Sequence, residues 1–285
     1  MLPSAAEECG RHPAIAYFHG MLPMSGFMIG GEGKVADMSA TELAALRRHY
    51  YGLIAEVDFE IGRVLDFLEA RGELDRTLIV FTSDHGEQLG DHYLLGKCGF
   101  YDESYHIPLI IADPRPEAAA TRGTIERGFS ESVDVMPTIL GWLGLPVPIS
   151  CDGASLLPLI HAEPGAAAKS AVHFEFSLRI GFPYAHLKPL DLDWRDSELT
   201  VLRTERFKYV HFTTLPPVLF DLESDPGELA NRAEDPAYRE AALDMARRML
   251  SWRMHHAERT LSRYNSSKRG LLDLASGRIM SEHRE

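Results

Sequence analysis

A short polar loop between two apolar segments carries the side chains best suited to chemistry. Asp84 and His85 offer a carboxylate oxygen and an imidazole nitrogen, and Gly86 directly after them permits a tight turn. Such donors bind Ca²⁺, Mn²⁺, Mg²⁺ or Zn²⁺. A bound ion needs about four to eight donor atoms, so these two residues supply only part of a site. The spacing alone is equally compatible with a structural role, in which Asp84 caps the next turn and His85 is an ordinary loop residue.

Lys97 follows Asp84 in the same polar segment, after Gly90 and Gly96. A lysine that returns to a metal site can neutralise the oxygens of a phosphoryl or sulfuryl group, or assist a leaving oxygen. Most single lysines in such loops are simply solvated. The interpretation of Lys97 as a catalytic residue therefore depends on the rest of the chain.

A long amphipathic helix is predicted ahead of this loop. Ser39 and Glu42 have the spacing of a capping box, and Gly72 is a natural stop. At 1.5 Å per residue the helix would be about 45 Å long, enough to cross the face of a sheet. Apolar residues recur in steps of three and four along one face. They are Leu43, Leu46, Tyr50, Leu53, Ile54, Val57, Ile61, Val64, Leu65 and Leu68.

Two short apolar runs, residues 77–82 and 107–112, flank the polar loop. Nearly continuous apolar runs of this length predict strands that are covered on both faces. A short helix is predicted around residues 132–143, with Pro137 near its start. The order of helix, strand, loop, strand and helix predicts an α/β sheet with helices on both faces. Ligands of such sheets gather at the carboxyl ends of the strands, where Asp84 lies.

The remainder of the chain has a different texture. Residues 161–165 indicate a linker, and Asp235 with Pro236 predicts the start of a helix that runs to about Tyr264. Residues 266–285 are polar and predict an arm or a frayed tail. We expect two domains, residues 1–165 and 166–285. Four short runs predict a small antiparallel sheet in the second domain: residues 172–176, 199–203, 208–212 and 219–222.

Composition limits the functional classes. The chain is 45% hydrophobic and 25% charged, with a net charge of −13, which does not suit binding to nucleic acid along its surface. Its apolar runs are too short to span a membrane, and no signal peptide is recognised. Cys9, Cys98 and Cys151 lack the spacing of a disulfide framework or a zinc knuckle. We therefore expect a cytoplasmic protein with neither nucleic acid nor membrane as a partner.

The polar loop belongs to a set of five motifs that occur in the order typical of one family. This set resembles the sulfatase branch of the alkaline phosphatase superfamily, and within it the phosphonate monoester hydrolases. The first motif comprises residues 81–92, Lys97 and residues 101–104 and 107–110. The other four are residues 132–138, 152–158, 206–210 and 220–228. The closer likeness to phosphonate monoester hydrolases comes from residues 209–212, 215–217, 251–253, 256–257 and 259–261.

The resemblance implies a fold, a reaction and roles for residues. The expected fold is α/β, with a partial alkaline-phosphatase-like sheet, flanking helices and a small antiparallel sheet in a carboxyl-terminal subdomain. The expected activity is metal-dependent hydrolysis of phosphonate monoesters, phosphodiesters or sulfate esters, which are small anionic esters. Asp84 and His85 would be two ligands of one divalent ion, namely Ca²⁺, Mn²⁺, Mg²⁺ or Zn²⁺. Lys97 would be the catalytic lysine near the transferred group.

The sequence departs from the family pattern at its amino-terminal side. Similar enzymes use a formylglycine nucleophile made from the cysteine of a Cys-x-Pro-x-Arg motif, and none of the three cysteines stands in that motif. Too few residues precede Ser39 to hold the strand that carries further acidic ligands. The sequence thus predicts the carboxyl-terminal portion of the enzyme, with a truncated sulfatase-like domain over residues 1–165. The alternative is an inactive fragment or pseudoenzyme that serves as a binding or homo-oligomerisation module through its carboxyl-terminal helix and arm.

Overall fold

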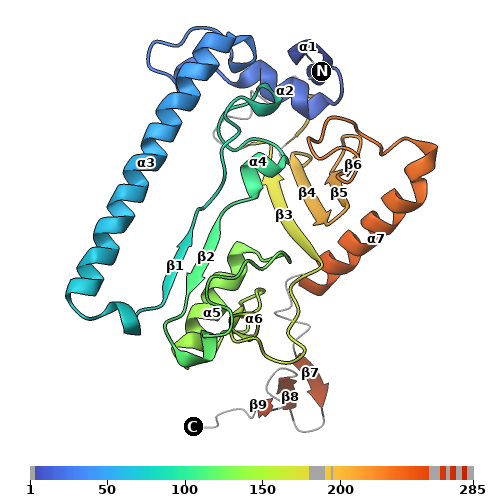
Figure 1. Cartoon of the computed structure of the whole chain (residues 1–285). Helices are drawn as coiled ribbons and strands as arrows, with labels where there is room; N and C mark the ends of the chain where they lie inside the picture. Colours follow the sequence, from blue (N-terminus) through green and yellow to red (C-terminus); the bar gives the residue numbers. More distant parts are fainter. Residues whose placement is uncertain are drawn as a thin grey trace, which may run out of the picture. The chain divides into compact units, whose positions relative to one another are not determined.

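The structure is a computed structural model that describes residues 4–179, 190–193, 195–256, 264–267, 270–273 and 278–280 (Figure 1). The chain divides into two compact units, Met1–Ala242 and Leu243–Glu285. The helices of the first unit are α1 (Ala5–Cys9), α2 (Pro13–Met21), α3 (Ala40–Ala70), α4 (Asp102–Tyr105), α5 (Val135–Trp142) and α6 (Leu157–Ile160). Its strands are β1 (Ile79–Thr82), β2 (Leu109–Ala112), β3 (Ala171–Ser177), β4 (Glu198–Thr204), β5 (Phe207–Phe212) and β6 (Val218–Asp221).

Helix α3 confirms the predicted long helix and both of its end signals. The Ser39 hydroxyl accepts from the amide of Glu42 at 3.3 Å, and the Glu42 carboxylate accepts from the amide of Ser39 at 2.8 Å. Gly72 adopts φ +63°, a conformation that favours glycine after a helix end. The predicted packing is different, because no residue of α3 is buried. Periodicity shows which face of a helix is apolar, but it does not show what covers that face.

Strands β1 and β2 confirm the positions of the two predicted strands but not their environment. They pair antiparallel, with Ile79 opposite Ala112 and Thr82 opposite Leu109, and lie side by side in Figure 1. Neither strand contains a buried residue, so the prediction that both faces are covered is wrong. The physical reason is that a run of apolar residues shows that a strand can be covered on both faces, but not what covers it. Within the described residues this sheet has only these two strands.

The core of the first unit lies against the second sheet, whose strand order is β3-β4-β5-β6. All three pairings are antiparallel, as predicted. Buried residues of this sheet include Val201 and Val210, which join one apolar cluster with Phe18 of α2 and with Leu94 and Phe100 of the polar loop region. The loop is thus fixed on a well-packed base. The division into residues 1–165 and 166–285 stays a prediction.

The carboxyl-terminal helix α7 (Arg239–His256) begins where predicted, after a 3₁₀ turn at Pro236–Tyr238 whose first amides are capped by Asp235. Its predicted end at Tyr264 is wrong, because Tyr264 opens a strand. That strand is β7 (Tyr264–Ser267), and it forms an antiparallel sheet with β8 (Gly270–Asp273) and β9 (Arg278–Met280). The predicted arm therefore contains strands, since short apolar runs within it favour extended backbone despite its polar composition. No helix in the described ranges is long and apolar enough to cross a membrane.

Candidate active site

Asp84 and His85 follow β1 directly, and the orientation of the imidazole ring suits a metal ligand. One ring nitrogen, Nδ1, lies 2.8 Å from the carbonyl oxygen of Gly86, so this nitrogen must carry the proton and donate. The other nitrogen, Nε2, lies 3.5 Å from Oδ2 of Asp84. A histidine whose second nitrogen donates to a carbonyl is the usual arrangement of a metal-binding imidazole. The two donors are therefore directed to one place.

The Asp84 carboxyl is held in its ionised form. Desolvation opposes ionisation, but the neighbouring His85, hydrogen bonds from the backbone and the Lys97 ammonium together lower the pKa of Asp84. Its side chain is 82% exposed, so the carboxylate is open to solvent. An ionised carboxylate is the form that a divalent cation binds. The electrostatic effect of Lys97 on the pKa of Asp84 indicates that the fold brings this lysine back toward Asp84. The spacing in the sequence alone could not establish this.

Glu87 fixes the segment that carries Lys97. Its Oε1 atom accepts from the amide of Gly96 at 2.6 Å and from the amide of Leu89 at 3.1 Å. The amide of Gln88 also donates to the carbonyl of Gly96 at 3.0 Å. Charge-assisted bonds of this kind are stronger than those between neutral groups. Lys97 itself is exposed and has no hydrogen bond or ion pair among the described residues, so its ammonium is available to an anion.

Gly86 and Gln88 close the loop against α4. The amide of Gly86 donates to the carbonyl of Ser104 at 2.8 Å, and a Cβ at position 86 would lie 2.0 Å from the carbonyl oxygen of Glu103. Only glycine fits there. The buried side chain of Gln88 donates to the Ser104 hydroxyl at 2.8 Å. Sequence reasoning assigned no role to Gln88 or Ser104, because their contact depends on how the loop folds back.

A buried ion cluster anchors the far end of the loop. The Lys208 ammonium contacts the carboxylates of Asp102 and Glu228, and donates to the carbonyl of Phe100 at 3.1 Å. Burial raises the pKa of Glu228 despite the lysine. Desolvation opposes ionisation of Asp102 too, but Lys208 and Arg203 hold its pKa below the usual value. Asp102, Lys208 and Glu228 come from three of the five sequence motifs. The sequence did not predict that these residues are in contact.

His92 occupies a second buried cluster beside the loop. Its ring stacks on Tyr101 with centroids 3.6 Å apart, and its Nδ1 lies 3.2 Å from Oε1 of Glu8. Its Nε2 lies 4.0 Å from Oε2 of Glu103. His92 adopts φ +52°, an unusual conformation for a residue with a side chain. Glu8 was not singled out from the sequence, and no local signal connects it with a residue so far along the chain.

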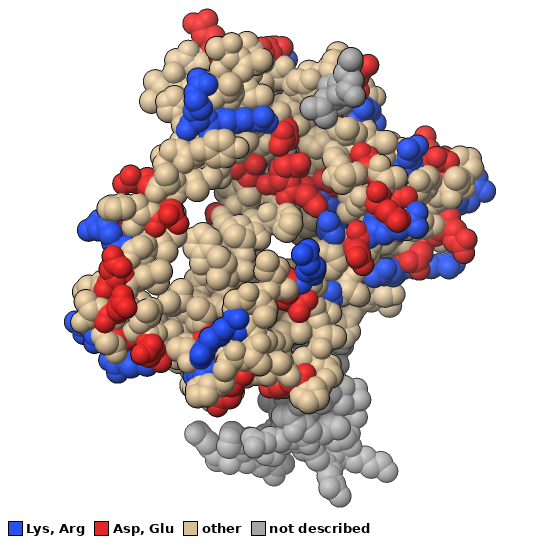
Figure 2. All heavy atoms as spheres, in the orientation of Figure 1, with Lys and Arg blue, Asp and Glu red and all other residues tan. Residues whose placement is uncertain are grey.

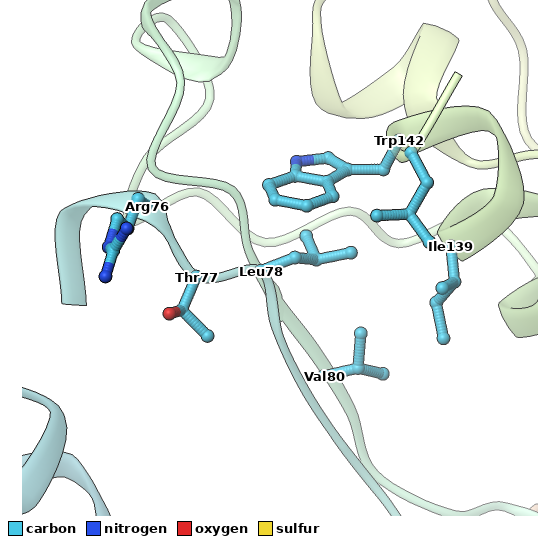
Figure 3. A pocket seen from close by; sticks show the side chains of 7 residues that line it. Arg76, Thr77, Leu78, Val80, Ile139 and Trp142 are labelled. Atoms are coloured by element: carbon cyan, nitrogen blue, oxygen red, sulfur yellow. The ribbon is translucent and has the colours of Figure 1, made fainter. Parts of the chain in front are cut away.

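Asp84 and His85 are the candidate metal ligands of the described part of the chain. No group of three or more His, Cys, Asp or Glu side chains in the described ranges could hold an ion together. Asp84 and His85 fit one divalent ion as two of its ligands, on the chemistry and direction of their donor atoms. The pocket of about 360 Å³ in Figure 3 is a separate feature, because it lies between the start of β1 and α5 and is mainly apolar.

Comparison with known sequences places the chain in a family. The model of the Sulfatase family matches residues 12–145, and the model described as "N-sulphoglucosamine sulphohydrolase, C-terminal" matches residues 90–255. The multifunctional alkaline phosphatase superfamily protein PehA of Trinickia caryophylli is 46% identical over 264 residues, which are 93% of this chain and 51% of PehA. Arylsulfatase K of Xenopus laevis is 32% identical over 201 residues, 70% of this chain and 35% of that protein.

Solved structures agree with the sequence comparison. The phosphonate monoester hydrolase of Agrobacterium radiobacter superposes with a TM-score of 0.88 at 39% identity, over 95% of this chain and 54% of that one. The phosphonate monoester hydrolase of Silicibacter pomeroyi gives a TM-score of 0.83 at 35% identity, over 95% of this chain and 52% of that one. The chain belongs to the sulfatase family of the alkaline phosphatase superfamily, a family of hydrolases, and the predicted fold class is confirmed. It spans about half the length of these relatives.

Proposed function

We propose that this chain is the carboxyl-terminal portion of a metal-dependent hydrolase of small anionic esters, namely phosphonate monoesters, phosphodiesters or sulfate esters. The observation that supports this most is the orientation of His85, whose Nδ1 donates to the Gly86 carbonyl and whose Nε2 lies 3.5 Å from Asp84 Oδ2. The likeness to the phosphonate monoester hydrolases of two organisms supports the reaction class. The family model described as carboxyl-terminal supports the position of this chain within the longer fold.

Asp84 and His85 would hold one divalent ion, which as a Lewis acid stabilises negative charge on the oxygens of the ester group. Two further residues of this chain have tasks around the ion. Lys97 binds and neutralises an oxygen of the anionic group, since its ammonium has no competing partner within the described ranges. Glu87 holds Lys97 in place through the amide of Gly96. The nucleophile, expected to be a formylglycine, would come from outside the sequence motifs present here.

Binding of Mn²⁺ tests the metal site directly. Titration followed by the electron paramagnetic resonance of the free ion should show weak binding to the intact chain, because two ligands satisfy an ion poorly. Asp84→Asn should abolish that binding. Asp91→Asn is the matched control, since Asp91 is an exposed carboxylate that pairs with Arg47 in the same loop region. If the parent chain binds no Mn²⁺, or if both variants lose binding equally, the proposed metal site is wrong.

A further inference from the structure

The loop between α2 and α3 has a fixed base. The amide of Met24 donates to the carbonyl of Gly33 at 3.0 Å. The amide of Val35 donates to the carbonyl of Leu22, also at 3.0 Å. The side chains of Leu22, Met24 and Val35 are buried in the apolar core of the first unit. Because backbone pairing and buried side chains hold both ends of the loop together, the residues between them stand on a stable support.

The part of this loop that faces solvent is apolar. Residues 23–31 contain no charged side chain. Figure 2 shows a largely uncharged surface over the loop, between α2 and the start of α3. Phe27 is 39% exposed, and Ile29 is fully exposed. Single exposed apolar residues are common on protein surfaces, so the position of each one decides what it can do.

Phe27 lies against the segment that carries Lys97. A Cβ added at Gly96, the residue before Lys97, would lie 3.1 Å from Cε1 and 3.6 Å from Cζ of the Phe27 ring. Gly96 adopts φ +75°, and its amide donates to Oε1 of Glu87 at 2.6 Å. The edge of the ring therefore approaches the same turn that Glu87 fixes. An aromatic surface is thus held beside the residue that precedes the candidate catalytic lysine.

An ester of the proposed class joins an anionic group to an organic group. Lys97 is exposed and has no hydrogen bond or ion pair in the part of the chain that the structure describes, so its ammonium can bind the anionic group. The organic group is attached to this anion through a single oxygen. It therefore lies within reach of the residues that border Lys97, and the Phe27 ring is an apolar surface at that border.

We propose that Phe27 is a specificity-determining residue, whose ring contacts the organic group of the ester and favours apolar groups over polar ones such as sugars. This inference rests on the proposed function, in which Lys97 binds the anionic group. A phenyl group packs favourably against an aromatic ring, face to face with an offset or edge to face. The hydroxyl groups of a sugar in the same place would give up hydrogen bonds to water without gaining partners from the ring.

Binding of two sulfate esters to the intact chain tests the proposal. Phenyl sulfate and glucose 6-sulfate carry the same negative charge, but one has an apolar ring and the other a polar ring. Titrations followed by the ¹H–¹⁵N nuclear magnetic resonance of the Gly96 and Lys97 amides give both dissociation constants. The constant for phenyl sulfate should be at least about threefold lower, which is the effect of one aromatic pair. Phe27→Ala should remove this preference and leave the affinity for glucose 6-sulfate unchanged.

Phe59→Ala is the matched control. It also removes an aromatic ring from the surface, since Phe59 is 63% exposed on α3, and it should keep the full preference for phenyl sulfate. If Phe27 only supported the loop that carries Lys97, Phe27→Ala would weaken the binding of both esters by the same factor. That result would overturn the proposal. Equal affinities of the parent chain for the two esters would overturn it as well, and so would loss of the preference in Phe59→Ala.

Lys97→Gln separates this proposal from the function on which it rests. The variant should weaken the binding of both esters equally, because it removes the charge that attracts their common sulfate group. A preference for phenyl sulfate that needs Phe27, with affinities that do not change in Lys97→Gln, would confirm the apolar contact and refute the proposed role of Lys97. Affinities that depend on Lys97 but not on Phe27 would refute this inference alone. Binding of neither ester would refute both.

Discussion

The Lys208 ammonium and the Glu228 carboxylate are in direct contact, and their side chains are 0% and 1% exposed. Lys208 lies on β5, whereas Glu228 follows β6, and both also contact the first turn of α4 through Asp102. Three sequence motifs are thereby joined in one buried ion cluster. Because α4 follows the loop that carries Lys97, this cluster ties the candidate active site to the four-stranded sheet.

Replacement of Lys208 should be strongly destabilising. Lys208→Met would leave the buried Glu228 carboxyl without its cation, whereas Asp102 keeps Arg203, at a cost of about 3–5 kcal/mol in the free energy of unfolding. Urea denaturation followed by circular dichroism measures this change. Arg63→Met is the control, since Arg63 and Glu60 form an exposed pair on α3 worth about 0–1 kcal/mol. Similar stabilities for the two variants would show that the buried cluster does not hold the sheet and loop together.

Gly86→Ala should disturb the loop, because the new methyl group would lie 2.0 Å from the carbonyl oxygen of Glu103. Relief of this clash moves the backbone and should cost about 1–3 kcal/mol. Gly52→Ala tests the same change where a Cβ meets no atom within 4 Å, in the middle of α3. That variant should be stabilised by about 0.5–1 kcal/mol through its higher helix propensity. Equal stability changes in urea denaturation would contradict the close approach at Gly86.

Local elements of this fold were predictable from the sequence, because their signals are local. Ser39 and Glu42 defined the start of α3, and the apolar runs located β1 and β2. The end of α7 was not predictable in the same way, since no glycine or proline follows His256 closely enough to mark it. Burial was also mispredicted, because a pattern of apolar residues does not show whether a partner surface is present.

The candidate site was predictable only in part. Asp84, His85 and Lys97 were identified from residue type and a family resemblance, and their roles stay predictions. The supports of the loop were not identified, since they depend on contacts between distant parts of the chain. His92 and Glu8, for example, are 84 positions apart, and only the folded chain brings them within 3.2 Å. A sequence motif indicates that its residues contribute to one site, but it does not show which of these residues are in contact.

His12 should make the stability of the chain depend on pH. Its Nδ1 accepts from the amide of Ala14 at 3.1 Å, and its Nε2 donates to the carbonyl of Pro216 at 2.8 Å. Burial lowers the pKa of His12, so the folded protein favours the neutral ring. This contribution is complete above about pH 6.5, the pKa of an unfolded histidine, and is lost as pH falls toward the lower folded value.

His12→Asn should reduce that dependence, because asparagine can still cap α2 but does not titrate. The measurement is the difference in free energy of unfolding between pH 7.5 and pH 5.5. The parent chain should lose more stability than His12→Asn over this interval. If both lose the same amount, other groups determine the acid sensitivity.

The chain alone should not hydrolyse aryl phosphonate or aryl sulfate esters. It offers two candidate metal ligands and a lysine, but none of its cysteines stands in the motif that forms the expected nucleophile. Release of the aryl alcohol, followed by absorbance with added Mn²⁺, should match the rate without protein. Robust hydrolysis that is lost in both Asp84→Ala and Lys97→Ala would show that the described residues suffice for catalysis.

Glu87→Ala should loosen the segment before Lys97, because two backbone amides lose their shared acceptor. Hydrogen bonds to a charged group contribute about 1.5–3 kcal/mol each, so the amide of Gly96 should exchange its hydrogen at least about tenfold faster. Glu87→Gln retains an acceptor oxygen and should restore most of the protection. Hydrogen–deuterium exchange of the peptide that contains Gly96 measures both variants. Unchanged exchange in Glu87→Ala would mean that the amide of Gln88, which donates to the Gly96 carbonyl, is sufficient to hold this part of the loop.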